Sequence, residues 1–475
     1  MMINILYNRY KKQVEQYKKI KGYYQGTTDA LTNYTETNRS NIKVNLNYLK
    51  KFVKEETAYS VGNPISYQSK TDDKEKIVAL AEVMGNYKEN HDINTFRKMV
   101  LYGLVYEITY IDKFDNLNVK TISPTDAYHE EDSEGNIINF IHVYTVTEVN
   151  EDTNMEEEKT YIDEYTDKEI NIYKCDGDPI LQKTIPHFFE EIPVGMAKKS
   201  EDTWRDTIYN DIKGIQDALE TNVSDITNEI SDFRNAYMVL RGISVDEDEA
   251  EKLKQKGIIE APEEGGVDWL IKNINDSFIQ NTIGNLHEKL YEITSHINHN
   301  DAQQMSNASG VALKSRLIAL TQICSINEGA FKELLKTRIR LIFKYLEITE
   351  KKKYDPKDIK IRFTPTIPND DNQTADLIGK LNGKVSAGTL LSLLSFVEDG
   401  QVEFEKAQKE KSKVDALNEV LSNVRSRKSY IEEYSEYESE AEITQIIKEK
   451  SELEGTQMGE FATINTAEKV DEEYE

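Results

Sequence analysis

NDAQQMSNASG (residues 300–310), followed by VALKSRLIALTQICSINEGAFKELLKTRIRLIFKYLEIT (residues 311–349), is the stretch that decides the architecture of this chain. The second part contains no proline, and Gly329 is its one glycine. Because proline breaks helix interiors, this part predicts a single helix of about 57 Å at 1.5 Å per residue. The first part is longer than the brief turn that usually joins two helices.

A second long helix and a small insert precede this loop. Apolar residues recur at a mean step close to 3.6, which predicts an amphipathic helix over Trp204–Phe233, about 45 Å long. Strand-like and helix-like pieces around a proline–glycine turn then predict a compact α/β insert over residues 235–283. Helical spacing resumes over Asn285–Ile297. The apolar stripe of the first helix consists of Ile208, Ile212, Ile215, Leu219, Ile226, Ile230 and Phe233.

The flanks of this core differ from each other. Residues 1–97 have helical spacing, whereas residues 98–190 are rich in Tyr, Ile, Val and Thr with turn signals between the runs, which predicts an antiparallel meander. A strand is expected within residues 354–366. Short helices follow, in which Gly383 ends one helix, while Ser386 and Asp399 cap the next two.

The composition is that of a soluble protein with an acidic end. No run approaches the roughly 18 apolar residues of a membrane span, and Glu15 and several lysines interrupt the N-terminus, so no secretory signal is expected. The net charge of −27 argues against a surface that grips nucleic acid, although a repulsive wall would let DNA slide. Residues 431–475 hold 15 acidic and 3 basic residues, so a largely disordered tail is expected.

No motif of a catalytic site is present. The segment GKLNGK (residues 379–384) has the wrong spacing for a phosphate-binding loop, and neither GxGxxG after a strand nor GxSxG occurs. The acidic clusters at 130–132 and 156–158 are assigned to hairpin turns, where charge is normally solvated. We therefore expect no enzyme activity, no catalytic residues and no cofactor.

The histidines and cysteines do not predict a metal site either. His287, His296 and His299 lack the accompanying ligands of a zinc site, so we interpret them as polar surface of the helix pair. Cys175 and Cys324 lie far apart without a CxxC motif, and are expected to be buried or idle thiols.

Two interpretations of the loop at residues 300–310 remain open. One is a flexible surface loop. The other is a loop that touches a polyanion weakly, because amides and hydroxyls bind phosphate oxygens without the strong, salt-dependent hold of Lys or Arg. Asp301 adds a repulsive charge to the loop.

Five groups of residues, in a fixed order along the chain, resemble the portal protein family of tailed bacteriophages, in the branch found in long-tailed phages of Gram-positive hosts. The resemblance covers roughly residues 20–410, and the part ahead of Gly22 is shorter than in many members. The groups are Gly22, Tyr23 and Tyr24 with Asn47–Ile65; Ile192, Pro193 and Val194; Ser224–Gly242; Ser309–Lys314; and Val385–Glu405.

The resemblance implies an α+β portal fold, with long helices around a central channel in a ring that typically has twelve subunits. Its implied regions are a wing (residues 1–203, with the long helix and return strand at 311–366), stem helices (204–234 and 284–299), a clip (235–283), a tunnel loop (300–310), a crown (367–426) and an acidic tail (427–475).

The resemblance also implies a role in the virion. The ring would occupy one capsid vertex after assembly in the host cytoplasm, pass double-stranded DNA during packaging and ejection, and bind no membrane. Its implied partners are the terminase large subunit, the major capsid and scaffolding proteins, and a head-completion or adaptor protein.

Two sets of site residues follow from the resemblance. The clip interface would use Tyr237, Val239 and Trp269. The DNA-facing loop would use Asn300, Asp301, Gln303, Gln304, Met305, Ser306, Asn307, Ser309 and Gly310.

Two rival functions are weighed against the portal. A non-viral helical scaffolding protein predicts heptads sustained over several repeats, but the stripes run nearer 3.6 and an α/β insert interrupts them. A metal-dependent nucleic-acid enzyme predicts carboxylates grouped on strands in a cleft.

Overall fold

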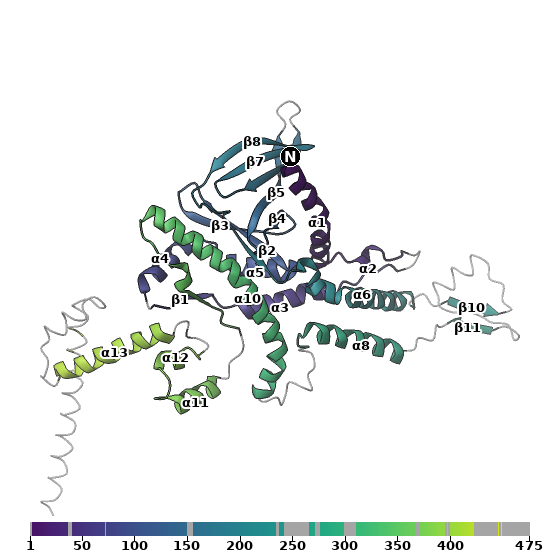
Figure 1. Cartoon of the computed structure of the whole chain (residues 1–475). Helices are drawn as coiled ribbons and strands as arrows, with labels where there is room; N and C mark the ends of the chain where they lie inside the picture. Colours follow the sequence, from purple (N-terminus) through teal and green to yellow (C-terminus); the bar gives the residue numbers. More distant parts are fainter. Residues whose placement is uncertain are drawn as a thin grey trace, which may run out of the picture. The chain divides into compact units, whose positions relative to one another are not determined.

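A computed structural model gives the architecture of the chain (Figure 1). Two compact units, residues 1–367 and 368–475, are each described by themselves. The described residues are 2–36, 40–71, 73–149, 155–233, 237–241, 266–270, 276–298, 310–366, 371–394, 397 and 400–421, with Gln445 and Lys448.

The first unit begins with helices, as the spacing predicts. Val14, Tyr17 and Ile20 form the buried side of the first helix. One part of this region is not helical, because residues 66–69 form strand β1 (Ser66–Ser69), which pairs antiparallel with β12 (Ile359–Arg362). The helices are α1 (Met2–Gln25), α2 (Asp29–Thr32), α3 (Tyr48–Val61), α4 (Lys74–Met84) and α5 (His91–Tyr102).

Two antiparallel sheets follow. One has the order β3-β2-β9, and the other has the order β4-β5-β6-β7-β8, so the predicted meander is confirmed for five consecutive strands. The strands are β2 (Leu104–Ile111), β3 (Leu117–Ile122), β4 (Ala127–Glu131), β5 (Ile137–Val149), β6 (Glu156–Tyr165), β7 (Glu169–Asp176), β8 (Asp178–Pro186) and β9 (Val194–Lys198).

The predicted start of the sheet region is wrong. Residues 98–102 complete helix α5, which ends at Gly103 in the left-handed region at φ +71°. A Cβ atom at Gly103 would lie 2.3 Å from the carbonyl oxygen of Thr203. Glycine therefore both ends the helix and lets the chain at Thr203 pass close by.

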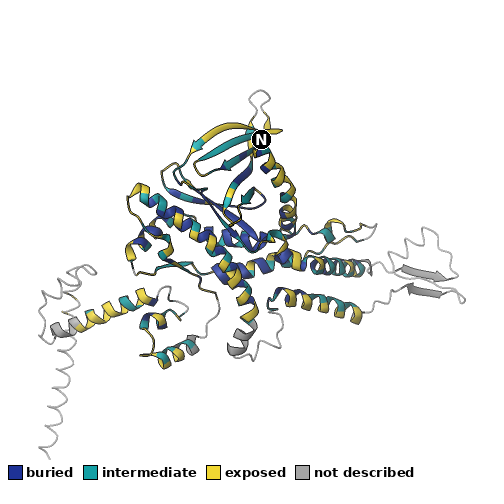
Figure 2. Ribbon diagram, viewed as in Figure 1, coloured by how far each residue is buried: buried dark blue, intermediate teal, exposed yellow. Residues whose placement is uncertain are grey.

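The long helix α10 (Gly310–Thr349) confirms the prediction from the proline-free stretch, and begins one residue earlier than expected. It packs on β9 and β2, and its contact side is buried in Figure 2. Gly195 of β9 permits this packing, since a Cβ there would lie 3.3 Å from the side chain and backbone of Leu334. Phe331, Leu334 and Leu335 belong to the same core as α3, α5 and β2.

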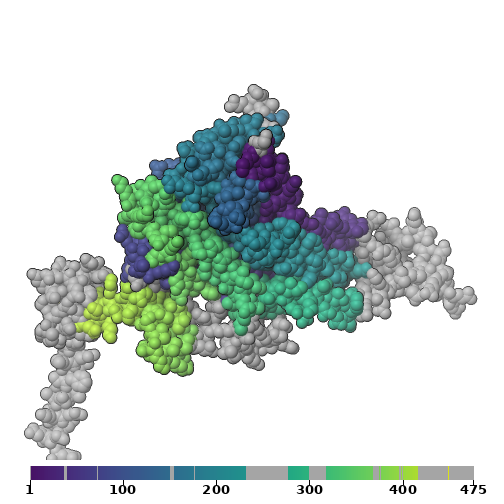
Figure 3. Space-filling view, viewed as in Figure 1, coloured from purple at the N-terminus to yellow at the C-terminus, as the bar shows by residue number. Residues whose placement is uncertain are grey.

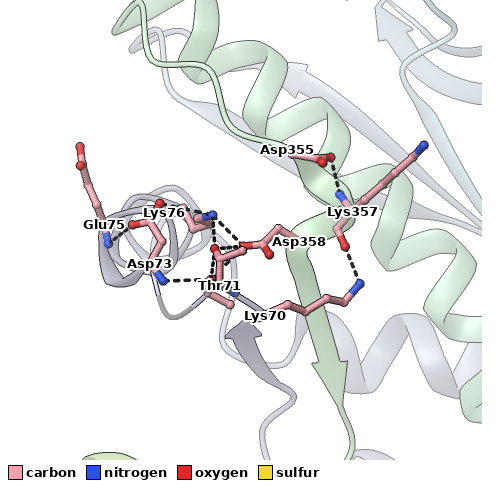
Figure 4. Close-up of polar contacts among 9 residues, drawn as sticks. Lys70, Thr71, Asp73, Glu75, Lys76, Asp355, Lys357 and Asp358 are labelled. Atoms are coloured by element: carbon pink, nitrogen blue, oxygen red, sulfur yellow. Dashed lines mark hydrogen bonds and ion pairs between the residues drawn. The ribbon is translucent and has the colours of Figure 1, made fainter.

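A polar cluster ties α4 to the chain that follows α10 (Figure 4). Lys76 donates to Asp358 over 2.6 Å and to the Thr71 hydroxyl over 3.1 Å. Asp358 closes the turn η2 (Pro356–Asp358) ahead of β12. The Lys76 ammonium and the Ser69 hydroxyl hold the pKa of Asp358 at about 2. The β1–β12 pair is thereby fixed at the end of the long helix.

The region predicted as two stem helices and an insert has different boundaries. Residues 203–205 form the turn η1 (Thr203–Arg205), and helix α6 (Ile208–Phe233) begins four residues after the predicted Trp204. Helix α8 (Asp276–Thr294) begins within the predicted insert and ends before Ile297. Of the insert, the structure describes β10 (Tyr237–Arg241) and β11 (Gly266–Leu270), which pair antiparallel.

The described part of the second unit contains two short helices, as expected, and one helix of 22 residues, which is longer than expected. Gly383 lies in the left-handed region at φ +77°, after the end of a helix, and the Ser386 side chain accepts from the Thr389 N–H. The predicted helix end at Gly383 and the predicted cap at Ser386 are both confirmed. Asp399 and residues 427–475, apart from Gln445 and Lys448, lie outside the described residues. The helices are α11 (Asp371–Leu381), α12 (Ala387–Leu391) and α13 (Gly400–Leu421). Among the described residues, no helix is long and apolar enough to cross a membrane.

Candidate functional site

Helices α6 and α8 pack against each other side by side (Figure 3). The first half of the apolar stripe of α6 is buried at Ile208, Ile212 and Leu219. Further along the same helix, Ile230 is 62% exposed. The chain alone therefore covers only the end of the pair that lies against the first unit's core.

A second stripe on α6 is polar and also buried. Gln216, Glu220, Ser224 and Asn228 follow one another at steps of four, and so lie on one face of the helix. Three of them accept hydrogen bonds from backbone N–H groups of the segment that leads into α3, and Gln216 accepts from the Leu49 N–H in the first turn of α3. This polar stripe gives the extended segment the partners that a neighbouring strand would otherwise supply.

The contacts of the polar stripe run in order along both elements. Asn228 accepts from the Ile42 N–H over 2.7 Å and donates to the Ile42 carbonyl over 3.0 Å. Glu220 also accepts from the Thr28 hydroxyl over 2.5 Å. The remaining rungs join Val44 N–H to Ser224 over 2.9 Å, Leu46 N–H to Glu220 over 3.1 Å, and Leu49 N–H to Gln216 over 3.2 Å.

Replacement of Asn228 by Ala should release the start of this segment. The variant loses both backbone hydrogen bonds to Ile42, at about 1–2 kcal/mol in all, so trypsin cleavage after Lys43 should accelerate about tenfold. Asn222→Ala is the matched control, because the Asn222 amide donates to Ala218 on its own helix. Equal cleavage rates in the two variants would contradict the role of the polar stripe.

The end of α8 is buried against α3, which corrects the interpretation of His296. Its ring stacks on Phe52 with centroids 4.3 Å apart, and its Nδ1–H donates to the Thr294 carbonyl over 2.9 Å. His296 is 6% exposed, so it is not polar surface. His287 is half-buried and contacts Tyr291, while His299 lies outside the described residues.

The Nε2 atom of His296 faces two carboxylates. Glu55 and Glu56 of α3 each place an oxygen 3.9 Å from it, and Nε2 has no hydrogen-bond partner among the described residues. Glu56 is 1% exposed, and its Oε2 accepts from the Asn327 amide of α10 over 2.7 Å. Three helices thus meet at one buried polar cluster, just before residues 299–309.

A pocket of about 230 Å³ opens beside this cluster. Its acidic groups outnumber its basic group, Lys199, and the pocket connects the buried Glu56 with solvent-exposed isoleucines. The lining residues are Glu56, Lys199, Asp206, Ile208, Asp211, Ile293, Thr294, Ile323 and Ile326.

A buried ion-pair network holds the other half of α10. Arg338 is 1% exposed and donates to both oxygens of Glu107 in β2, over 2.8 and 2.5 Å. Arg338 also pairs with Asp92 over 2.7 Å, and His91 contacts Glu107 over 2.6 Å. Burial raises the pKa of Glu107, but the Arg338 charge and the His91 contact outweigh it and hold the pKa at about 2.

The sequence placed both acidic clusters in hairpin turns, which is confirmed for Asp132, in the turn between β4 and β5, and wrong for the other residues. Glu130 and Glu131 belong to strand β4, where Glu130 pairs with Arg9 and Glu131 pairs with Lys198. Residues 156–158 belong to strand β6. No group of three His, Cys, Asp or Glu side chains within the described ranges is placed to hold a metal ion. Cys324 is buried and Cys175 is half-buried.

The structure places the predicted clip residues in a strand pair. Tyr237 lies opposite Leu270, Val239 opposite Asp268, and Trp269 opposite Met238. Of the predicted tunnel loop, Gly310 is the first residue of α10. The other eight predicted loop residues, Asn300, Asp301, Gln303, Gln304, Met305, Ser306, Asn307 and Ser309, lie outside the described residues.

The order of these elements is matched by a known family. The family described as phage portal protein, SPP1 Gp6-like, matches residues 3–417. The chain belongs to this portal protein family. The portal protein of Bacillus phage SPP1 is 22% identical over 417 residues, which is 83% of this chain and 80% of that protein. The portal protein of Clostridium phage phiCD119 is 26% identical over 54% of this chain and 58% of that protein.

Two solved structures also align with the chain at 10% identity. A chain in the virion of a native gene transfer agent particle has a TM-score of 0.43 and covers 80% of this chain and 92% of its own length. A chain in the neck of an empty gene transfer agent particle has a TM-score of 0.37, with 74% and 88% covered.

Two groups within this portal fold were missed from the sequence. The polar stripe is present in the sequence as Gln, Glu, Ser and Asn at steps of four, but apolar periodicity alone does not indicate a buried polar face. Glu56, His296 and Asn327 lie on three separate elements, and no local spacing links them. Their shared burial becomes evident only once α3, α8 and α10 are packed.

Proposed function

We propose that this chain is the head-to-tail connector of a tailed phage. It forms a homododecameric ring at one capsid vertex, carries double-stranded DNA inward at packaging and outward at ejection, and binds terminase and head-completion proteins in turn. The family match over residues 3–417 carries the proposal and favours it over a scaffolding protein or a nuclease. The role is structural, and the motor that hydrolyses ATP is a separate protein.

The exposed apolar residues of the stem support a ring. Ile230 of α6, Ile293 of α8 and Ile326 of α10 are 62%, 50% and 61% exposed. Because a cyclic assembly covers each subunit with its neighbours, we assign these residues to contacts between adjacent copies. The same assembly brings all copies of the 300–310 loop to one height around the channel, where Asn, Gln and Ser side chains touch DNA weakly.

The far end of the stem is assigned to the clip. Strands β10 and β11 join the ends of α6 and α8 along the chain, so the clip lies farthest from the core formed by α3, α5 and β2. In this proposal Tyr237, Val239 and Trp269 contact the next subunit and support the surface that terminase and adaptor proteins bind.

The ring is tested by mass photometry and negative-stain images of the purified chain, alone and with its scaffolding and capsid proteins. Closed rings are expected for the native sequence. Ile230→Asp should weaken each interface by at least about 2 kcal/mol, since an unpaired charge would be buried there, and should shift the protein to smaller species.

Phe114→Asp is the control, because Phe114 is 70% exposed in the turn between β2 and β3, away from the stem. It should assemble as the native chain does. A native chain that stays monomeric under both conditions would overturn the proposed function. Equal assembly of the two variants would remove Ile230 from the interface.

A further inference from the structure

The cluster of Glu56, His296 and Asn327 joins α3, the turn that follows α8, and the long helix α10. Ser295 has a positive φ of 56°, so the chain leaves helix α8 in a tight turn, and His296 is the next residue. Its side chain contacts α3 rather than solvent. This side chain therefore fixes the position of the chain directly after α8.

The cluster is incompletely paired in one specific way. Nδ1 of His296 is used by Thr294, and Oε2 of Glu56 is used by Asn327, while Nε2 and Oε1 face each other at 3.9 Å. A neutral imidazole and a carboxylate would present two acceptors to each other. When either group carries a proton, it becomes a donor, and the contact between the two groups becomes attractive.

We propose that Glu56 and His296 act as positioning residues that share one proton, and that with Asn327 they hold residues 296–298 in place up to about neutral pH. This positioning occurs within one chain and does not require a ring. Its importance for DNA passage rests on the proposed function.

Charged and titratable groups face the pair from every neighbouring element. Opposite charges are mixed among them, and burial of both groups favours the proton on Glu56. They are Lys51 and Glu55 of α3, Lys199 and Asp206 ahead of α6, Asp211 of α6, and Cys324 and Glu328 of α10.

As pH rises, titration of Glu56 and titration of His296 change the stability of this contact in opposite directions. Burial raises the pKa of Glu56 to about 7, so the contribution of Glu56 is complete below its ordinary pKa and is lost as pH rises through 7. Burial lowers the pKa of His296 to about 4, so its contribution grows as pH rises towards its ordinary value of 6.5. In the native chain the two dependences partly cancel between pH 6 and 8 and leave a fall of about 2.5-fold.

Hydrogen–deuterium exchange of the purified full-length chain tests this cancellation. The measurement is the protection factor of peptides covering residues 286–298 at pH 6, 7 and 8, corrected for intrinsic exchange. Glu56→Gln leaves the histidine dependence alone, so protection should rise roughly fourfold from pH 6 to pH 8. His296→Phe keeps a ring on Phe52 and leaves the Glu56 dependence, so protection should fall roughly tenfold.

Glu333→Gln is the control, because Glu333 is exposed on α10 and pairs with Lys336. Peptides from β5 and β6 give an internal reference. A residue with a purely structural role would shift protection equally at every pH. If both cluster variants changed protection in the same direction with pH, or if neither differed from the native chain by twofold, the proposal would be wrong.

Should His296→Phe fail to fold, Glu56→Gln decides alone, by a roughly fourfold rise where the native chain falls about 2.5-fold. The exchange measurement does not depend on ring formation. If the protection factor of Glu56→Gln did not change with pH while images showed closed rings, only the shared proton would be rejected. If the two variants changed with pH in opposite directions but no rings formed, only the proposed ring would be rejected.

Discussion

The Arg338→Met variant is expected to lose about 3–5 kcal/mol of unfolding free energy. The substitution leaves the fully buried carboxylate of Glu107 without its bidentate partner, and desolvation of an unpaired charge is costly. Urea unfolding at pH 7, with the midpoint and slope both measured, gives the loss directly. A decrease below 1 kcal/mol would mean that Arg338 does not hold α10 on β2.

Arg340→Met is a matched control on the same helix. Arg340 also pairs with a glutamate, Glu191, but its side chain is 50% exposed. Exposed ion pairs contribute only about 0–1 kcal/mol, so this variant should unfold near the native midpoint. Burial, rather than the number of hydrogen bonds, is what separates the two arginines.

The buried ion pair of Glu107 and Arg338 also predicts that the unfolding free energy decreases in acid. Because the folded pKa of Glu107 is held at about 2, below its ordinary value, its contribution is complete above about pH 4.5 and is lost as pH falls towards 2. The native chain should therefore lose stability through this range. In the Glu107→Gln variant the unfolding free energy should decrease less over the same pH range, because the glutamine side chain does not titrate.

The second large effect is expected in DNA packaging. Gln303→Lys combined with Gln304→Lys should slow packaging by at least tenfold while rings and procapsids still form. Each added lysine binds a phosphate and releases counterions, so every copy would have to break strong contacts before DNA advances. The measurement is packaged DNA per procapsid in a reaction with terminase and ATP, at two salt concentrations.

Gln182→Lys with Thr184→Lys adds the same charge to the exposed edge strand β8 and serves as control. It should package at the native rate. Raised salt should partly restore the loop variant, because the added contacts are electrostatic. If the loop variant fills heads as fast as the native chain, the loop does not face DNA.

Much of the fold could be predicted from where proline is absent and where apolar residues repeat. The long helix α10 and the five-stranded meander follow from these patterns. The start of α6 could not be predicted in this way. Its helical hydrogen bonds begin at Thr207, whose carbonyl accepts from the N–H groups of Asn210 and Asp211. Trp204 has the apolar character of the stripe but belongs to the preceding turn.

The candidate site was less predictable than the fold. Periodicity describes one element at a time, and it placed His296 inside a helix that ends at Thr294, two residues earlier. It could not show that α3 would cover that end, because the covering residues lie some 240 positions away in the chain. A histidine that seemed exposed on an isolated helix is buried once the helices pack.

The polar stripe on α6 also constrains how the segment around Ile42 can change length. Two residues of extended chain advance about 6.6 Å, and four residues of helix advance about 6.0 Å, so alternate N–H groups meet successive polar side chains. Deleting Lys43 alone would turn the remaining N–H groups away from the helix, whereas deleting Lys43 and Val44 together would restore the alternation. Refolding yields of the two deletions would show the difference. Length variation among homologues should therefore occur there in steps of two residues.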